Sequence, residues 1–401
     1  MNISETLRAQ IASNQRISLW VGIVFLVICG VVFSLDTAKF FQAYLLGYMF
    51  WMHLTLGCLG LVMMHNLTGG AWGDASRRFL EAGMRTLWLM ALLFLPIFFL
   101  GLPYLYPWAN PEQVAHNAIL QQKAFYLNRE FFGIRAVGYF AFWIFWAYML
   151  YKGSQDFERT PTLSIVRRLE NISGPGALLF ALVVTLASVD WMMSLEPAWY
   201  STIYGILFVV GQGLTGLAFA IVLATWFAKY EPFSELLTPK HFHDLGNLMV
   251  GFVVLWTYGS FSQFLIIWSA NLPEEIPWYL HRIRGGWQVI AMFLMIFHFF
   301  VPFFVLLSRQ LKRKKNLLVK VAAWMLFVRF VDLFWWIIPA FPNTGLMSVL
   351  PQVWLYAVTF LGIGGAWLAT FFWQLQARSL LPLPDSSYEA VTGELEHAQK
   401  A

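Results

Sequence analysis

The chain has 401 residues, of which 59% are hydrophobic and 12% are charged, and its mean hydropathy is +0.63. Soluble domains carry about 25% charged residues, so this composition, with 20 Trp and 38 Phe, excludes an ordinary soluble protein. We expect an all-α polytopic membrane protein.

About ten segments are long and apolar enough to cross a bilayer as helices, each needing about 20 residues. In chain order they are residues 17–35, 41–65, 86–104, 131–151, 175–195, 201–228, 246–270, 286–308, 318–338 and 350–377. The first follows Arg8 and Arg16 and has no small-residue cleavage site after it, so we interpret it as a signal anchor.

The basic residues indicate how the chain is oriented. Most of the 26 Lys and Arg residues lie at the N-terminus, in the connections after spans 2, 4, 6 and 8, or in the C-terminal tail. The positive-inside rule therefore predicts that both termini are cytoplasmic. The run RQLKRKK, residues 309–315, is interpreted as a topology anchor, with docking of lipid head groups or of a partner as the alternative. Topology accounts for the net charge of +5, so nothing points to nucleic acid as a partner.

The chain also resembles itself. Val189-Asp190 and Val331-Asp332 are each followed by Pro-Ala-aromatic at the same distance, and FYLNREFFG (125–133) is similar to WYLHRIRGG (278–286). Two glycine pairs, Gly57/Gly60 and Gly213/Gly216, also match, and small residues of this kind let helices approach closely. Because the matches keep their order, spans 2–5 and 6–9 are predicted to be two parallel four-helix repeats flanked by spans 1 and 10.

This repeat divides the chain into four parts. Residues 1–40 hold the N-terminal tail and span 1, residues 41–200 the first repeat, residues 201–345 the second repeat, and residues 346–401 span 10 and a cytoplasmic tail.

Ionisable side chains inside the spans are the candidate functional residues, because charges at membrane depth are costly and normally face the bundle interior. The candidates are His53, Arg135 and Asp190 in the first repeat, and His298, Arg329, Asp332 and the neutral Gln263 in the second. Arg329 and Asp332 are three residues apart, which predicts a pair on one helix face. Such a pair either fixes helix packing or takes part in proton or quinol chemistry, and the sequence leaves both open.

Asp190 has no cation on its own helix, so Arg135, at a similar depth, is its expected partner. A poorly solvated carboxyl group there can exchange protons, and a buried structural hydrogen bond is the alternative. Glu196 lies just beyond the span and is expected to be a solvated interfacial carboxylate.

The histidines and cysteines give little support to a bound metal. His53 and His298 lie near mid-span, as haem ligands do, but they occupy non-equivalent helices of the repeat, so hydrogen-bonded core or channel histidines are preferred. Cys29 and Cys58, both in spans, form no metal-ligand pattern. The pair His241 and His243 is interpreted as part of a solvated loop, with a metal site as the alternative. We expect no haem or iron–sulfur cluster in this chain.

Three stretches carry a resemblance to a known family. ASVDWMMSLEPAWYSTIYG (187–205), FSQFLIIWSANLPEEIPWYLHR (261–282) and HDLG (243–246) resemble the second of the two large membrane subunits of bacterial alternative complex III. Those subunits belong to the polysulfide-reductase-like (NrfD-type) membrane family. The resemblance extends over most of the chain.

The resemblance implies an integral subunit of a quinol:cytochrome c or electron-acceptor oxidoreductase in the bacterial inner membrane. It implies bound menaquinol or ubiquinol, a paralogous membrane subunit, an iron–sulfur subunit and multihaem cytochrome c subunits as partners, and lipids around the helices. A terminal oxidase is a further candidate partner. Asp190 and His53 would form the quinol or proton site in the first repeat, with Arg135, His298, Arg329, Asp332 and Gln263 on a proton path. The alternative is a structural or proton-conducting subunit with a vestigial pocket.

Overall fold

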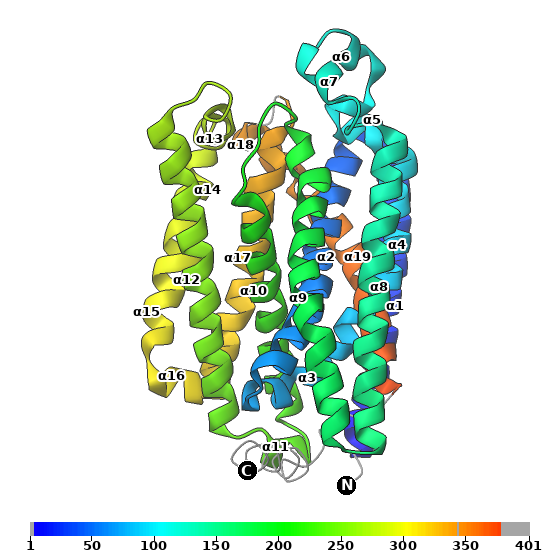
Figure 1. Ribbon diagram of the computed structural model, residues 1–401, viewed down its shortest axis with the longest axis vertical. Helices are drawn as coiled ribbons and strands as arrows, with labels where there is room; N and C mark the ends of the chain where they lie inside the picture. Colours follow the sequence, from blue (N-terminus) through cyan, green and yellow to red (C-terminus); the bar gives the residue numbers. More distant parts are fainter. Residues whose placement is uncertain (1–3, 343–344, 378–401) are drawn as a thin grey trace.

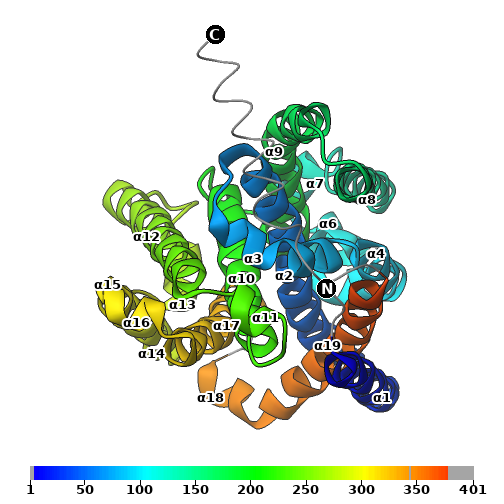
Figure 2. The ribbon, with the colours of Figure 1, turned by 90° about the horizontal axis from the view of Figure 1, so that it is seen from below.

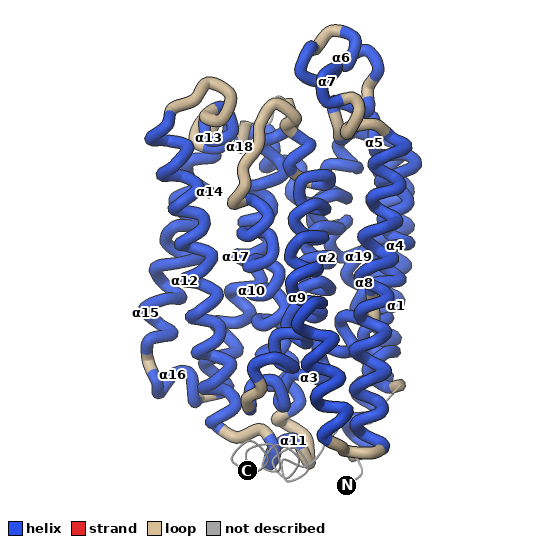
Figure 3. Tube along the Cα trace, in the orientation of Figure 1, coloured by secondary structure: helices blue, strands red, loops and turns tan. Residues whose placement is uncertain are grey.

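The computed structural model describes residues 4–342 and 345–377, apart from the side chain of Asp74, and these residues form helices joined by short loops (Figures 1 and 3). Within this described part, nine helices are long and apolar enough to cross a membrane. The chain is therefore a multi-pass α-helical membrane protein. The predicted cytoplasmic tail lies, from residue 378 to the C-terminus, outside the residues that the structure describes.

The long helices match the ten predicted spans in order. They are α1 (Glu5–Leu35), α2 (Thr37–Thr68), α3 (Ala71–Met84) with α4 (Leu87–Pro96), α8 (Arg129–Arg159), α9 (Leu163–Trp191), α10 (Tyr204–Phe227), α12 (Pro239–Ala270), α14 (Trp287–Leu294) with α15 (Val301–Leu307), α17 (Lys315–Ile337) and α19 (Val353–Gln376). Short helices lie between them: α5 (Leu102–Leu105), α6 (Pro111–Ala115), α7 (Ala118–Lys123), α11 (Phe233–Leu236), α13 (Pro277–Arg282), α16 (Arg309–Arg313) and α18 (Leu346–Val349).

One expected span, 318–338, is not among the nine. Its helix, α17, is 23 residues long, but Lys320, Arg329 and Asp332 give it more charged side chains than the other spans carry in their apolar stretches. It nevertheless packs within the bundle against α10 and α14. The count of ten spans and the division into two repeats stay predictions.

Several helices begin at capping residues that the sequence supplies. Asp36 accepts a hydrogen bond from the Lys39 amide at 3.1 Å and starts α2, and Asn128 accepts one from the Phe131 amide at 2.8 Å and starts α8. Side-chain oxygens at these positions satisfy amides that have no partner inside the helix.

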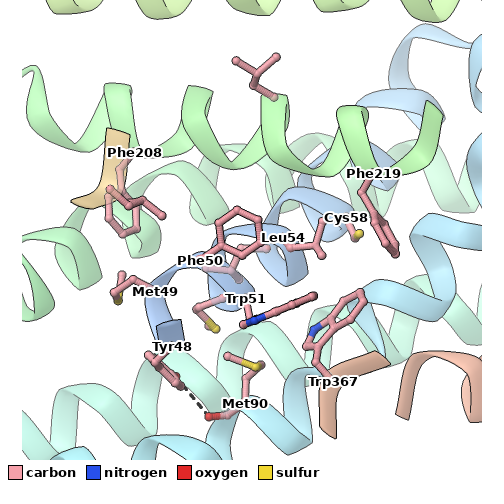
Figure 4. Packing of buried hydrophobic residues seen from close by; sticks show 14 of the residues in the cluster. Tyr48, Met49, Phe50, Trp51, Leu54, Cys58, Met90, Phe208, Phe219 and Trp367 are labelled. Atoms are coloured by element: carbon pink, nitrogen blue, oxygen red, sulfur yellow. Dashed lines mark hydrogen bonds between the residues drawn. The ribbon is translucent and has the colours of Figure 1, made fainter. Parts of the chain in front are cut away.

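α2 and α10 form the centre of the bundle. Seen from below in Figure 2, α12, α14, α15 and α17 lie to one side of them and α4 and α8 to the other, while α1 lies beside α19. Of the apolar stretch of α2, 94% is buried, as expected for a helix that is hydrophobic all round. Figure 4 shows its Tyr48, Trp51 and Leu54 among Phe208 of α10, Met90 of α4 and Trp367 of α19.

Glycines allow the closest helix crossings. A β-carbon at Gly57 of α2 would lie 2.0 Å from the Gln212 carbonyl oxygen of α10, and one at Gly365 of α19 would lie 2.3 Å from the Gly22 amide nitrogen of α1. Helices in lipid associate mainly through such close packing, because burial of apolar surface gives no gain there.

One end of the bundle carries a basic helix. The start of α1 and the basic helix α16 lie at one end, which we call the α16 end (Figure 1). The opposite end, called the α13 end, carries α13, α18 and the protruding helices α6 and α7.

Candidate functional site

A cavity of about 630 Å³ lies between α10, α12, α13, α14 and α17, in the half of the helices that was predicted to be the second repeat. Ligand pockets typically measure about 300–1,000 Å³ and are mostly apolar, with a few polar groups that orient the ligand. Most of the lining is aromatic or aliphatic, and the polar members are Thr257, Ser260, Gln263, Tyr279, Asp332 and the tryptophan indoles. The cavity thus fits an apolar molecule with a small polar part.

Asp332 is the one carboxylate in this lining, and it is 1% exposed. Its Oδ2 accepts a hydrogen bond from Trp256 Nε1 at 3.2 Å and pairs with the guanidinium of Arg329, one turn earlier on α17. Its Oδ1 has no hydrogen-bond partner among the described residues, although the Trp336 side chain also interacts with the carboxylate. A buried oxygen without a partner costs about 1–3 kcal/mol, so a bound molecule or water that donates to this oxygen would be stabilised.

Arg329 is buried beside Asp332, and a glycine makes room for it. A β-carbon at Gly211 of α10 would lie 2.2 Å from Arg329 Nη2. Two opposite charges buried together offset part of the large cost of removing each from water. The pair predicted from the three-residue spacing is therefore present, and its place beside the cavity depends on α10.

His298 lies against Trp256, in a π-helical turn (Met295–Phe300) that joins α14 to α15. The ring centroids of His298 and Trp256 are 3.7 Å apart, and neither ring nitrogen of His298 has a partner among the described residues. π-helical turns are rare and occur often at functional sites. This turn places a buried imidazole in contact with the tryptophan that donates to Asp332.

Gln263 connects the cavity to the α13 end. Its Nε2 donates to the Tyr279 hydroxyl at 3.4 Å, and its Oε1 accepts from the Ser201 hydroxyl at 3.0 Å. Gln263 and Tyr279 both line the cavity. A ligand with two polar groups could therefore contact Asp332 with one and Gln263 or Tyr279 with the other.

Several lining residues are exposed on the outer surface of the bundle. Phe261 of α12 is 60% exposed and Met292 of α14 is 59% exposed, and Met295 and Phe300 are also exposed. In a membrane-spanning protein, exposed apolar side chains at this depth face lipid. The cavity is therefore bordered by side chains that face the hydrocarbon between α12 and α14.

Buried charges cover the cavity at the α13 end. The guanidinium of Arg282 lies 3.8 Å from the ring centroid of Trp278, donates to the Trp336 carbonyl at 2.7 Å and pairs with Glu196 Oε2 at 2.7 Å. Glu196 was expected to be a solvated carboxylate, but its side chain is only 14% exposed. It is mostly buried because the segment after α9 folds against α13, where the Arg282 cation is available to it.

The charges around Glu196 also determine its pKa. Burial alone would raise the pKa of this carboxyl group, but Arg282 and His281 outweigh that effect, and the pKa lies below its ordinary value of 4.5. Glu196 is therefore an anion at neutral pH.

Asp190, predicted to be the counterpart of Asp332 in the first repeat, has a complete set of partners. Its Oδ2 accepts from Arg135 Nε and from the Tyr139 hydroxyl, each at 2.7 Å, and its Oδ1 accepts from Arg135 Nη2 at 2.9 Å. The Arg135 guanidinium also lies 3.8 Å from the ring centroid of Tyr126. Arg135 was expected to be the partner of Asp190, and the two form a bidentate ion pair that matches the structural alternative.

His53 has different neighbours from Asp190. Its Nδ1 lies 2.7 Å from the Met49 carbonyl oxygen on its own helix, and its ring packs against Phe208 of α10 at 4.2 Å between centroids. His53 thus packs against α10, and it is not among the hydrogen-bond partners of Asp190.

Sequence reasoning found Asp332, Arg329, His298 and Gln263 but missed Trp256, Tyr279, Arg282 and the burial of Glu196. The sequence did mark two of these residues, because Tyr279 and Arg282 lie in the motif WYLHRIRGG, which is repeated along the chain. Trp256 gave none, since it is one of 20 tryptophans in an apolar chain.

His241, from the proposed loop cluster, lies in the first turn of α12, where its Nδ1 is 2.8 Å from the Thr238 hydroxyl. In the described part of the chain, no group of three or more His, Cys, Asp or Glu side chains is placed to hold a metal ion. Comparison with models of known protein families gave no match, and comparison with curated proteins gave none either.

Proposed function

We propose that the protein is an integral membrane subunit of a respiratory quinol oxidoreductase similar to alternative complex III, and that it binds quinol in the cavity beside Asp332. The observation that carries the proposal is the free Oδ1 of a buried carboxylate in a mostly apolar cavity. A quinol has hydroxyl groups on a flat ring and an apolar tail. Its hydroxyl groups match the acceptor oxygen, its ring matches the aromatic lining, and its tail matches the border of lipid-facing side chains.

Menaquinol and ubiquinol both meet this description. The ring would lie among Trp256, Trp335 and Trp336, one hydroxyl would donate to Asp332 Oδ1, and Gln263 or Tyr279 would contact the second oxygen. The tail would leave between Phe261 and Met292 toward lipid. Asp332, held by Arg329 and Trp256, would accept the proton when the quinol is oxidised.

The electrons would pass to a partner. The expected partners are those implied by the resemblance: an iron–sulfur subunit, multihaem cytochrome c subunits and a paralogous membrane subunit. In this proposal the chain lies in the bacterial inner membrane with both termini in the cytoplasm, so that the α13 end faces the periplasm. It has ten spans arranged as two parallel four-helix repeats.

Asp332 replaces Asp190 as the favoured proton acceptor, since all the hydrogen-bonding oxygens of Asp190 are occupied by Arg135 and Tyr139. Asp190 and Arg135 would then hold α8 to α9.

A second candidate function is proton conduction without quinol chemistry. It is favoured by the buried polar side chains near the bundle centre: His53, Arg329, Asp332 and His298, with Gln212, whose amide atoms have no partner among the described residues. Buried polar groups of this kind usually hold ordered water, and water between them could carry protons.

Two variants of α12 would test the quinol site. Ser260→Trp fills the cavity, whereas Leu255→Trp places the same side chain on the exposed, lipid-facing side of the same helix. We expect quinone that co-purifies with the complex, measured in an organic extract, to fall at least tenfold in Ser260→Trp and to stay at the wild-type level in Leu255→Trp. Equal quinone in both variants would contradict the proposal and leave proton conduction as the better candidate.

A further inference from the structure

The basic segment at the α16 end has no part in the proposed binding of quinol. Residues 309–320 hold six cations and no acidic residue: Arg309, Lys312, Arg313, Lys314, Lys315 and Lys320. A topology anchor needs only the positive charge of such a segment, wherever its side chains lie. The structure shows in addition that this segment is held in one place.

Contacts with α12 fix the position of α16. Ser308, between α15 and α16, has a ψ of 113°, and its hydroxyl oxygen accepts a hydrogen bond from the Leu311 amide at 3.3 Å, so a new helix begins there. Lys312 is buried, and its Nζ donates to Asn247 Oδ1 of α12 at 2.6 Å. Gly246 of α12 makes room for this lysine, because a β-carbon there would lie 2.7 Å from Lys312 Cγ.

A second lysine is bound just after the end of α16, and the remaining cations are left exposed. Lys315 Nζ donates to the Ala228 carbonyl at the end of α10, at 2.9 Å. Asp244, the acidic residue of α12 that is nearest in sequence to Asn247, lies 3.5 Å from His243. Four exposed cations have no side-chain hydrogen bond or ion pair among the described residues: Arg309, Arg313, Lys314 and Lys320.

An apolar face of the preceding helix leads directly to these cations. Phe300, Phe304 and Leu307 are 42%, 64% and 54% exposed. Their spacing of four and three residues puts them on one side of the helix. In a membrane-spanning protein such side chains face lipid, and Arg309 follows the last of them by two residues. The boundary of the hydrocarbon therefore lies close to α16, which follows α15 at the lower left of Figure 1.

We propose that Arg309 and Arg313 bind the phosphate of an anionic phospholipid whose acyl chains lie along Phe304 and Leu307. The two arginines are four residues apart on α16, so their guanidinium groups lie on one face. A guanidinium can form two parallel hydrogen bonds with a phosphate, and a cluster of cations attracts lipids with a net negative charge. An acidic protein segment would match the cations but not the apolar face beside them. The inference does not depend on the proposed binding of quinol.

Three variants of the full chain test the inference. Arg309→Gln/Arg313→Gln removes the two guanidinium groups. Arg8→Gln/Arg16→Gln removes two exposed arginines of α1, whose start lies at the same end, and is the matched control. A chain that ends at residue 377 lacks four acidic residues that could compete for the cations: Asp385, Glu389, Glu394 and Glu396.

The measurement compares an anionic with a zwitterionic lipid. Each purified protein is mixed in detergent with equal amounts of phosphatidylglycerol and phosphatidylcholine, both with a photoreactive acyl chain. Native mass spectrometry counts the lipid molecules that the protein retains. Illumination followed by peptide mapping then locates the residues to which each lipid becomes crosslinked.

We expect the wild type to retain at least fivefold more phosphatidylglycerol than phosphatidylcholine, with crosslinks in residues 300–307. Arg309→Gln/Arg313→Gln should retain at least fivefold less phosphatidylglycerol than the wild type, whereas the control and the shortened chain should match the wild type. If the double variant does not fold, Arg309→Gln and Arg313→Gln carry the test singly. Each keeps five of the six cations and should lose at least half of the bound phosphatidylglycerol.

Equal retention of the two lipids by the wild type would overturn the proposal, as would equal crosslinking of residues 300–307 in the double variant and the control. More phosphatidylglycerol on the shortened chain than on the wild type would overturn it in favour of the chain's own acidic segment as the occupant. Loss of a protein partner from the double variant alone, with phosphatidylglycerol still bound, would overturn it in favour of a protein contact.

Discussion

Gly211 of α10 and Arg329 of α17 lie so close that a β-carbon on the glycine would be 2.2 Å from the guanidinium nitrogen Nη2. The absence of a side chain at position 211 is therefore what leaves Arg329 beside Asp332. Since the glycine is in a helix, its role here is to make space and not to adopt an unusual backbone conformation.

Gly211→Ala should consequently move Arg329 and weaken its pair with Asp332. Breaking a buried ion pair costs about 3–5 kcal/mol, and a partial displacement should cost less. We expect a lower temperature of thermal unfolding in detergent and a loss of bound quinone. Gly251→Ala on α12, where an added β-carbon meets nothing within 4 Å, is the control and should unfold no earlier than the wild type. Equal effects of the two variants would show that the guanidinium has room to move.

The second prediction separates the stability of the buried pair from its function. Arg329→Met alone leaves Asp332 as an uncompensated buried carboxylate, and Asp332→Leu alone leaves the arginine unpaired, so each should destabilise by about 3–5 kcal/mol. The double variant Arg329→Met/Asp332→Leu removes both charges and should regain most of the stability, as measured by thermal unfolding, while quinol turnover stays absent. A double variant that keeps turnover would contradict the role of Asp332.

The third prediction concerns the crossing of the two central helices. A β-carbon at Gly57 would lie 2.0 Å from a backbone oxygen of α10, which no rotation of a side chain can relieve. Gly57→Ala should therefore separate α2 from α10 and reduce the yield of folded protein several-fold, measured as the monodisperse fraction after extraction. Gly30→Ala on α1, where an added β-carbon meets nothing within 4 Å, should have the wild-type yield. The same yield for both variants would mean that the crossing is looser than described.

The fourth prediction is a pH dependence at the α13 end. The pKa of Glu196 is lowered from 4.5 in the folded protein, although burial alone would raise it, because Arg282 and His281 stabilise the anion. A group with a depressed pKa contributes stability above its unfolded value and loses that contribution as the pH falls through its folded value. The difference in unfolding temperature between wild type and Glu196→Gln should thus be constant above pH 5 and shrink below 4.5. A difference that grows as the medium is acidified would contradict the sign of this shift.

Sequence reasoning located the helices because their signal is local. The segment predicted at 350–377 is α19 (Val353–Gln376), and that at 246–270 is the apolar part of α12 (Pro239–Ala270). The two extra turns at the start of α12 were missed because they are polar; Thr238 caps them and Pro239 fits the first helical position.

Two ion pairs were also predictable from the sequence. The pair Arg329–Asp332 followed from a spacing of three residues, and the pair Arg135–Asp190 followed from the similar depth of the two residues in the membrane. The cavity could not be predicted from the sequence. It exists because side chains from several helices leave space between them, and a sequence does not show how such side chains pack against one another. The expectation for Glu196 was wrong for a similar reason, since its position in the sequence says nothing about a cation 86 residues further along the chain.

The lipid-facing border of the cavity, at Phe261 and Met292, affects how any occupant is supplied. A molecule that enters there comes from the bilayer and not from water, so its effective concentration is its mole fraction among the lipids. A weak intrinsic affinity would then be enough for high occupancy in a membrane rich in that molecule. Dilution of the membrane with added lipid that lacks the molecule would lower its occupancy even though the protein itself is unchanged.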